Sequence, residues 1–147
     1  MNSKVNEIQI SYKEKLKTQV KISSSSDAKD ILYKHWNKNT IGLFETFNIM
    51  LLNNSNMVKG ICQISSGGIT GTLVDVRILF GIVLKSLSVG VILAHNHPSG
   101  ILKPSEADKI LTQKIKKAAA LFDVKILDHL IIIPNGKYYS FADHNVL

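Results

Sequence analysis

The stretch that decides the fold reads Ala94-His95-Asn96-His97-Pro98-Ser99-Gly100 and continues, after three further residues, with Pro104-Ser105-Glu106-Ala107-Asp108. It joins an apolar run typical of a buried strand, residues 89–95, to a helical pattern over residues 105–122 through a loop that contains proline and glycine. His95 and His97 are two positions apart, so at the end of a strand both imidazoles point to the same side. We therefore expect a polar site where this strand ends.

Asp108 can complete a metal site with the two histidines. The loop and the helix can bring its carboxylate back to the strand end, and two imidazoles with one carboxylate suit zinc, leaving a fourth position for water. Two structural alternatives stay open. A bare His-x-His is a weak motif that structural or surface histidines also produce. Ser105-x-x-Asp108 is also the pattern of a capping box that opens a helix.

The rest of the chain predicts one sheet flanked by helices. Apolar residues at helical spacing favour helices over residues 27–37 and 74–86, the second capped by Thr72. Apolar and β-branched runs favour strands over residues 43–52, 57–64, 124–133 and 137–141, with a further short strand over 19–22. Asn135-Gly136 is typical of a hairpin turn between the last two strands of the domain. The expected fold class is α/β or α+β, with a mixed central sheet and helices on its faces.

Length and composition indicate one domain with a polar arm. The chain has 147 residues and is 45% hydrophobic, which is ordinary for a globular domain with its own core. We expect an N-terminal arm over residues 1–22 and the domain over residues 23–147. No apolar run reaches the roughly 18 residues of a membrane span, and the N-terminus lacks the apolar centre of a signal peptide. These features predict a cytoplasmic protein, and the single cysteine, Cys62, excludes an intrachain disulfide or a cysteine-rich zinc site.

The charge of the chain leaves a nucleic-acid partner open. The net charge is +7, and an excess of positive charge can attract nucleic acid. The lysines are scattered along the chain, however, and Arg77 is the single arginine, although arginine is the residue that best recognises bases and phosphates. The pattern therefore favours a solvated surface over a dedicated nucleic-acid face.

Together these motifs resemble the RadC family, whose domain is of the JAB/MPN (JAMM) metalloprotease-like type. The resemblance rests on His95-x-His97-Pro98 followed by Ser105-x-x-Asp108, and on Leu127-Asp128-His129-Leu130 and Tyr139-Ser140-Phe141. It covers the chain from about residue 23 to the C-terminus and implies a JAB/MPN fold of cytidine-deaminase-like architecture. RadC proteins often carry a helix-hairpin-helix region before this domain, and the present chain looks like the short, stand-alone form.

The resemblance also implies a role for each site residue. His95, His97 and Asp108 would hold Zn²⁺, Ser105 would donate a hydrogen bond to the oxyanion that forms during attack on an acyl group, and an upstream glutamate would act as general base and then acid. Glu45 is the best candidate for this glutamate. In a strand it would lie on the same face as Phe47, and a nearby zinc ion would explain a carboxylate on an apolar face. The alternative is that Glu45 lies at an exposed strand end and is simply solvated.

Other polar residues of the motifs have weaker assignments. Glu106 is a rival to Glu45, but its place at a helix start suits the helix dipole better. His129 can orient a metal ligand from behind, while a structural pair of Asp128 and His129 is the favoured alternative. Asn96 and Ser99 are expected to shape the loop, although either can contact a substrate.

Three functions follow from this sequence. The first is a zinc-dependent metallopeptidase or isopeptidase-like hydrolase that acts on an amide of unidentified sequence. The second is a DNA-associated, DNA repair-linked protein or a metal-dependent nuclease, in line with the historical label of the family, although a family name does not establish a function. The third is a non-catalytic metal-binding scaffold, which the presence of three protein ligands instead of four disfavours. A homodimer is left open.

Overall fold

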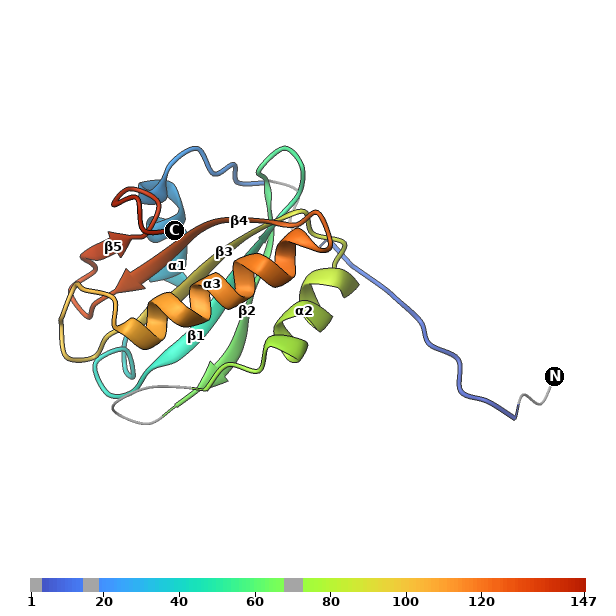
Figure 1. Cartoon of the computed structure of the whole chain (residues 1–147), viewed down its shortest axis with the longest axis horizontal. Helices are drawn as coiled ribbons and strands as arrows, with labels where there is room; N and C mark the ends of the chain where they lie inside the picture. Colours follow the sequence, from blue (N-terminus) through green and yellow to red (C-terminus); the bar gives the residue numbers. More distant parts are fainter. Residues whose placement is uncertain (1–3, 15–18, 68–72) are drawn as a thin grey trace.

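The computed structural model describes residues 4–14, 19–67 and 73–147, and it places a single sheet between helices. Two helices, α2 (Val76–Lys85) and α3 (Glu106–Ala120), cover one face of the sheet. A third helix, α1 (Ser25–His35), covers the opposite face (Figure 1). The mixed α/β class with a central sheet, predicted from the sequence, is confirmed.

The sheet has five strands in the order β2-β1-β3-β4-β5. Their bounds are Thr46–Leu52 for β1, Val58–Ser66 for β2, Gly90–Asn96 for β3, Lys125–Ile132 for β4 and Tyr138–Ser140 for β5. Neighbouring strands are antiparallel except β3 and β4, which are parallel and are connected through α3. A parallel pair requires such a crossover. Side chains at the carboxyl end of β3 therefore lie beside the start of α3, the usual place of a ligand site in α/β sheets.

Alternation along the central strands sends their apolar side chains into two cores. On β1, Phe47, Ile49 and Leu51 pack in the core beneath α2 and α3, whereas Met50 and Leu52 pack in the core beneath α1. All seven residues of β1 and all seven of β3 are buried, as expected for strands covered on both faces. The carboxyl end of β3 is consequently held by rigid packing on both sides.

Several element boundaries differ from the sequence-based prediction. The strand predicted from residue 43 begins at Thr46, because residues 40–44 form turns that donate backbone hydrogen bonds to Asn37 and Thr40. The strand predicted over residues 19–22 is wrong: only an isolated bridge joins Lys21 to Met57. The end predicted for the strand over residues 57–64 is also wrong, since β2 continues through Ser65 and Ser66.

The helix starts are defined by short polar side chains. Ser24 caps α1 by accepting a hydrogen bond from the Asp27 amide, and Asp75 caps α2 by accepting one from the Arg77 amide. The cap of α2 predicted from the sequence, Thr72, lies outside the described residues, and the prediction is wrong because Asp75 has this role. Each such cap satisfies a backbone amide that has no partner within its own helix.

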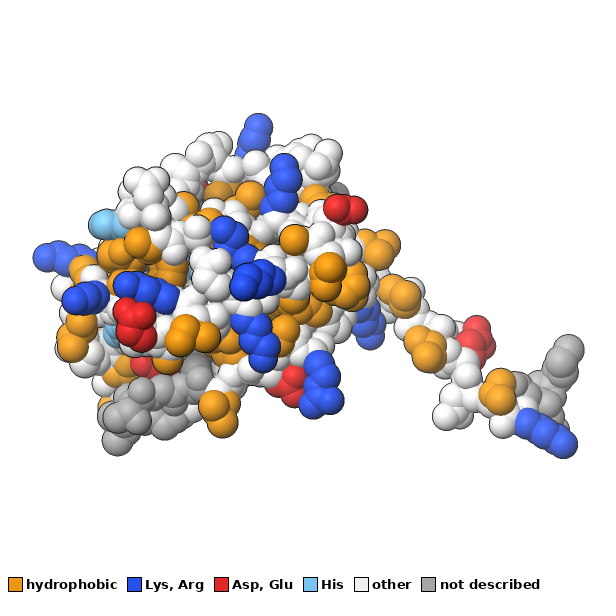
Figure 2. Space-filling view, viewed as in Figure 1, with side chains coloured by type: hydrophobic (Ala, Val, Ile, Leu, Met, Phe, Trp, Pro, Cys, Tyr) orange, Lys and Arg blue, Asp and Glu red, His pale blue; other side chains and the backbone are white. Residues whose placement is uncertain are grey.

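The N-terminal segment differs from the body of the molecule. Residues 4–14 form neither helix nor strand, and apolar side chains lie along the segment (Figures 1 and 2). The segment extends away from the domain at its N-terminal end, whereas the Tyr12 hydroxyl donates to the carbonyl of Lys59 on β2 over 3.3 Å. Within the described residues, no helix combines the length and the apolar character needed to cross a membrane. The division of the chain at residue 22 stays a prediction.

Candidate metal centre

A tight turn after β3 positions His97. The amide of Gly100 donates to the carbonyl of His97 over 3.1 Å, which closes a turn with Pro98 at the second position, where proline is favoured. Gly100 has a φ of +83°, a conformation that glycine adopts without strain. The turn brings the carbonyl of Ile101 to 2.7 Å from Nδ1 of His97. Because a carbonyl only accepts, Nδ1 of His97 carries a proton, and Nε2 is the nitrogen that faces His95 and Asp108.

The start of α3 positions Asp108. Ser105 and Asp108 form the predicted capping box: Oγ of Ser105 accepts from the Asp108 amide over 3.0 Å, and Oδ2 of Asp108 accepts from the Ser105 amide over 2.8 Å. The structural interpretation of this motif is therefore correct, and it is compatible with the functional one. The cap fixes the Asp108 carboxylate, and Oγ of Ser105 acts in it only as an acceptor, so its proton is available to another group.

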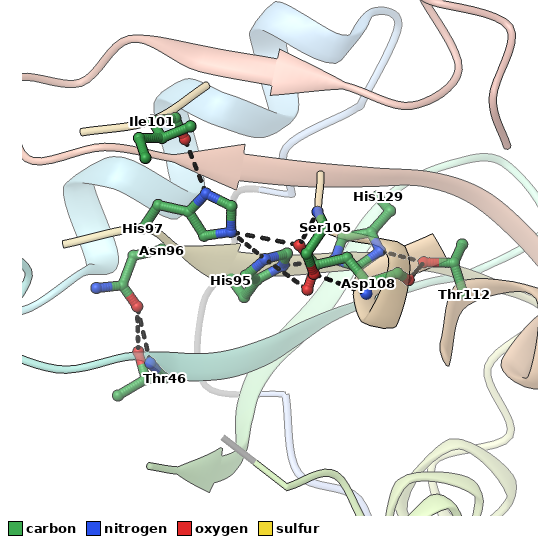
Figure 3. A network of polar contacts seen from close by, with 9 residues as sticks. All are labelled: Thr46, His95, Asn96, His97, Ile101, Ser105, Asp108, Thr112 and His129. Carbon is green, nitrogen blue, oxygen red and sulfur yellow. Dashed lines mark hydrogen bonds and ion pairs between the residues drawn. The ribbon is translucent and has the colours of Figure 1, made fainter. Parts of the chain in front are cut away.

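Three candidate ligands converge at this point (Figure 3). Nε2 of His95 lies 2.9 Å from Nε2 of His97, and each of these nitrogens lies 3.4 Å from one carboxylate oxygen of Asp108. Ligand atoms held tetrahedrally at about 2.0–2.1 Å from a zinc ion are roughly 3.3 Å apart, close to these separations. Two imidazole nitrogens and a carboxylate oxygen are also ligands that zinc commonly has. The cluster therefore fits a zinc ion.

The pKa values in the cluster follow from its mutual contacts. Burial raises the pKa of Asp108, but its contacts with His95 and His97 outweigh this effect and hold the pKa far below its ordinary value. Burial lowers the pKa of His97, but Asp108 and the Ile101 carbonyl outweigh it and raise the pKa overall. The carboxylate is thus charged at any pH of interest, and the raised pKa of His97 favours a protonated ring that offsets this charge in the metal-free protein.

Glu45 lies immediately before β1. The sequence predicted that it lies inside this strand, and that prediction is wrong. Its backbone carbonyl accepts from the Gly67 amide over 2.9 Å, and the residue is half-buried. Burial raises the pKa of its carboxyl group; His95 and His97 oppose this effect, and Asp108 adds to it. The carboxylate therefore lies within electrostatic range of all three candidate ligands.

His129 lies directly behind His95. Its Nε2 is 2.7 Å from Nδ1 of His95, and its Nδ1 is 2.7 Å from Oγ1 of Thr112. Thr112 is completely buried and also donates to the carbonyl of Asp108 over 2.7 Å. Burial lowers the pKa of His129 well below its ordinary value. The ring is therefore neutral, and it connects His95 to α3.

A register shift between β3 and β4 gives His129 this position. Val91 pairs with Ile126, but Ile92 pairs with Asp128, so one extra residue is present on β4. Strict alternation from Ile126 would send His129 to the α1 face. The extra residue, a β-bulge, returns it to the face of His95.

Asn96 is turned away from the cluster, toward β1 (Figure 3). Its side-chain oxygen accepts from the Thr46 amide over 2.7 Å, and its side-chain nitrogen donates to the carbonyls of Ile41 and Phe44 over 2.8 and 3.0 Å. The residue is completely buried. Asn96 therefore joins the strand that bears the histidines to the segment that bears Glu45, and it has no access to a substrate.

The remaining polar residues lie outside the cluster. Ser99 accepts from the Ile101 amide over 3.4 Å within the turn, and Glu106 is exposed on the first turn of α3. Asp128 forms a separate buried network, accepting from the Ser140 hydroxyl over 2.6 Å and from the Ala142 amide over 3.0 Å. The Asp128 carboxylate also accepts from the backbone amide of His129 over 2.7 Å, but the side chains of the two residues do not contact each other in a hydrogen bond and have different partners. The sequence prediction missed Thr112, whose only signal is its spacing of four residues from Asp108 on the same helix.

The fold and the cluster define an α/β domain with a candidate metal centre at the junction of a strand and a helix. Residues 22–146 match the family described as the RadC-like JAB domain. The chain belongs to this family, as its motifs predicted.

Named relatives support the assignment. The chain is similar to a "UPF0758 protein" of Flavobacterium johnsoniae, with 52% identity over 128 residues that cover 86% of this chain and 53% of the relative. A protein of the same name from Porphyromonas gingivalis is 44% identical over 99 residues, covering 67% of this chain and 44% of the relative. A third protein of this name, from Nitrosococcus oceani, is 41% identical over 104 residues, which cover 71% of this chain and 46% of the relative. The chain spans about half the length of these curated relatives.

Proposed function

We propose that the protein is a zinc-dependent hydrolase of amide bonds, a metallopeptidase or isopeptidase-like enzyme. The observation that supports the proposal most directly is the cluster of His95, His97 and Asp108. The two Nε2 atoms lie 2.9 Å apart, and each lies 3.4 Å from an oxygen of the Asp108 carboxylate. Membership of the JAB domain family also supports the proposal. Bound zinc would lower the pKa of a water molecule to about 7 and supply a nucleophile at neutral pH.

The protein side chains would perform the proton transfers. Glu45 accepts the proton of the attacking water and returns it to the leaving nitrogen, so that an amide and water give a carboxylic acid and an amine. Its raised pKa makes the carboxylate more basic and suits it to this task. Ser105, whose hydroxyl proton is not used by the capping box, donates to the developing oxyanion. The substrate would be a peptide or an isopeptide.

In the molecule itself, the support for a nucleic-acid role is its net charge of +7. Figure 2 shows lysine and arginine side chains spread over the visible face, with apolar surface between them. Such a distribution predicts weak association that falls steeply with salt, as for any non-specific contact with phosphates. Affinity for duplex DNA that persists at physiological salt would favour the DNA-associated alternative.

The proposal is tested by the metal content and amide hydrolysis of three proteins. We expect about one zinc per chain in the wild type and in His35→Ala, because His35 is exposed at the end of α1. His97→Ala removes one of three ligands, so we expect its zinc affinity to fall by more than about 100-fold, since changes behind a ligand already cost about 10–100-fold.

Elemental analysis after dialysis, together with hydrolysis of a peptide and isopeptide library, gives the outcome. Stoichiometric zinc in His97→Ala would remove this residue from the site. Zinc binding without hydrolysis in the wild type would favour the metal-binding scaffold instead.

A further inference from the structure

The single proton of the Thr112 hydroxyl determines the direction of a chain of hydrogen bonds. Oγ1 of Thr112 contacts the carbonyl of Asp108 and Nδ1 of His129, each over 2.7 Å. A carbonyl oxygen can only accept, so the hydroxyl donates to Asp108. The Thr112 oxygen must then accept its second hydrogen bond, and Nδ1 of His129 must carry the proton that is donated.

The same logic continues to His95. A neutral imidazole carries one proton, so with Nδ1 protonated, Nε2 of His129 is an acceptor. Nε2 lies 2.7 Å from Nδ1 of His95, which therefore donates. Nε2 of His95 is left with a lone pair directed toward His97 and Asp108 (Figure 3).

We propose that Thr112 and His129 form a hydrogen-bond relay that fixes His95 in its Nδ1–H tautomer and thereby presents Nε2 as a metal ligand. The inference rests on the proposed metal site and assigns positioning roles to two residues behind it. The Ile101 carbonyl does the same for His97, so each histidine ligand has its own tautomer-setting partner. Such partners fix the orientation of ligating histidines and raise their basicity.

The relay also couples two elements. Thr112 lies four residues after Asp108 on α3 and donates to the carbonyl of that ligand residue, whereas His129 lies on β4. The position of Asp108 and the tautomer of His95 consequently depend on the same hydroxyl group. Without it, the buried Nδ1–H of His129 would lack an acceptor, which favours the other tautomer in both rings.

The test compares Thr112→Val, which keeps the shape and removes the hydroxyl, with Thr112→Ser, which keeps the hydroxyl. The tautomers are read in metal-free protein at mildly alkaline pH from long-range ¹H–¹⁵N correlations of the imidazole rings. Zinc affinity is read separately by competition with a chromophoric chelator. We expect Nδ1–H forms of His95 and His129 in the wild type and in Thr112→Ser, and a shift toward Nε2–H forms in Thr112→Val. Zinc affinity of Thr112→Val should fall about 10–100-fold.

A matched control separates the relay from general loss of a buried hydroxyl group. Ser88 is buried two residues before β3 begins, at the end of the strand that lies away from the cluster. Its hydroxyl group contacts the Ser86 hydroxyl group over 2.7 Å. Ser88→Ala should lower the unfolding temperature without changing either the tautomers or the zinc affinity.

The outcomes distinguish the relay from the proposed hydrolase. If the wild type binds zinc but metal-free His95 is the Nε2–H form, or if Thr112→Val matches the wild type in both readouts, the relay is wrong and the zinc site stands. If the wild type binds no zinc, the hydrolase and the metal-presenting part of the relay are both wrong, while the tautomers still decide the hydrogen-bond directions.

Discussion

The two sides of the candidate site differ in how firmly the chain holds them. On the ligand side, His97 is held by the Ile101 carbonyl, His95 by His129, and Asp108 by the amide of Ser105. On the other side, Glu45 is half-buried, and within the described part of the chain its carboxylate has no hydrogen-bond partner. The candidate ligands are thus oriented by contacts within the metal-free protein, whereas no hydrogen bond among the described residues fixes the Glu45 carboxylate.

This difference matches what each side would have to do. Ligands that are already oriented lose little conformational freedom on binding a metal. A general base must accept a proton at one position and deliver it at another, so a carboxylate without fixed partners is suited to both steps. The side that would bind the metal is therefore built from backbone and buried contacts, and the side that would transfer protons is built from charge and partial burial.

The largest effect on hydrolysis, and the clearest difference between the ligand side and the Glu45 side, is expected for Glu45→Gln. The substitution keeps the size of the side chain and removes its basicity, so hydrolysis should fall by about 10²–10⁴-fold. Zinc content should not change, because Glu45 is not among the convergent ligands. Retained activity in Glu45→Gln would exclude this residue as the base, and lost zinc would make it part of the ligand side.

The pH dependence gives the same substitution a second readout. Activity should disappear as the pH falls through the pKa that Glu45 has in the zinc-loaded protein, and the residual activity of Glu45→Gln should lack that limb. In the metal-free protein the pKa of Glu45 is raised above 4.5. A raised pKa also means that the metal-free folded state favours the protonated carboxyl group. The contribution of Glu45 to the stability of the folded state is therefore fully present below the pKa of the unfolded chain. It is lost as the pH rises through the pKa of the folded protein. Glu45→Gln should therefore raise the stability of metal-free protein at neutral pH, measured by denaturant unfolding.

Ser105 gives the next largest effect, because it belongs to both the cap and the proposed chemistry. Glycine is nearly as good a helix cap as serine, with a cost of a few tenths of a kcal/mol, but it has no hydroxyl group to donate. Ser105→Gly should therefore lower kcat by about 10²–10³-fold with little change in unfolding temperature or zinc content. Ser105→Thr, which keeps both functions, is the control. A fall in stability that parallels the fall in kcat would restrict Ser105 to the cap.

The cluster of candidate metal ligands could be predicted from the sequence because its signal is local. His95 lies at the end of β3, His97 lies directly after it, and Asp108 lies in the first turn of the next helix, so one strand–helix junction contains all three. The order of elements is predictable for the same reason, since hydrophobic periodicity is a local property.

The partners behind the ligands could not be predicted because they depend on register. The contact of His129 with His95 requires the extra residue between the pairs Val91–Ile126 and Ile92–Asp128, and a shift of one residue sends a side chain to the other face. The sequence of β4 contains no pattern from which this register shift could be predicted. The role of Thr112 could not be predicted either, because its contact with His129 depends on how β4 lies against α3.

The smallest effect on chemistry is expected for Asn96→Ala, which tests how Glu45 is connected to the ligand side. The substitution leaves the Thr46 amide and the carbonyls of Ile41 and Phe44 without the partner they now share. The cost should be about 3 kcal/mol of unfolding free energy, since each buried unpaired group costs about 1–3 kcal/mol and relaxation recovers part of this.

The matched control for this variant is Asn53→Ala, at the other end of β1. Asn53 accepts from the amides of Ser55 and Met57, so its removal also breaks contacts between an asparagine side chain and the backbone. Both variants should unfold at lower denaturant concentration and keep their zinc. Only Asn96→Ala should also lose activity, by roughly 10-fold, because a small displacement of a catalytic group is enough to slow the reaction. Equal activity of the two variants would show that Glu45 holds its position without Asn96.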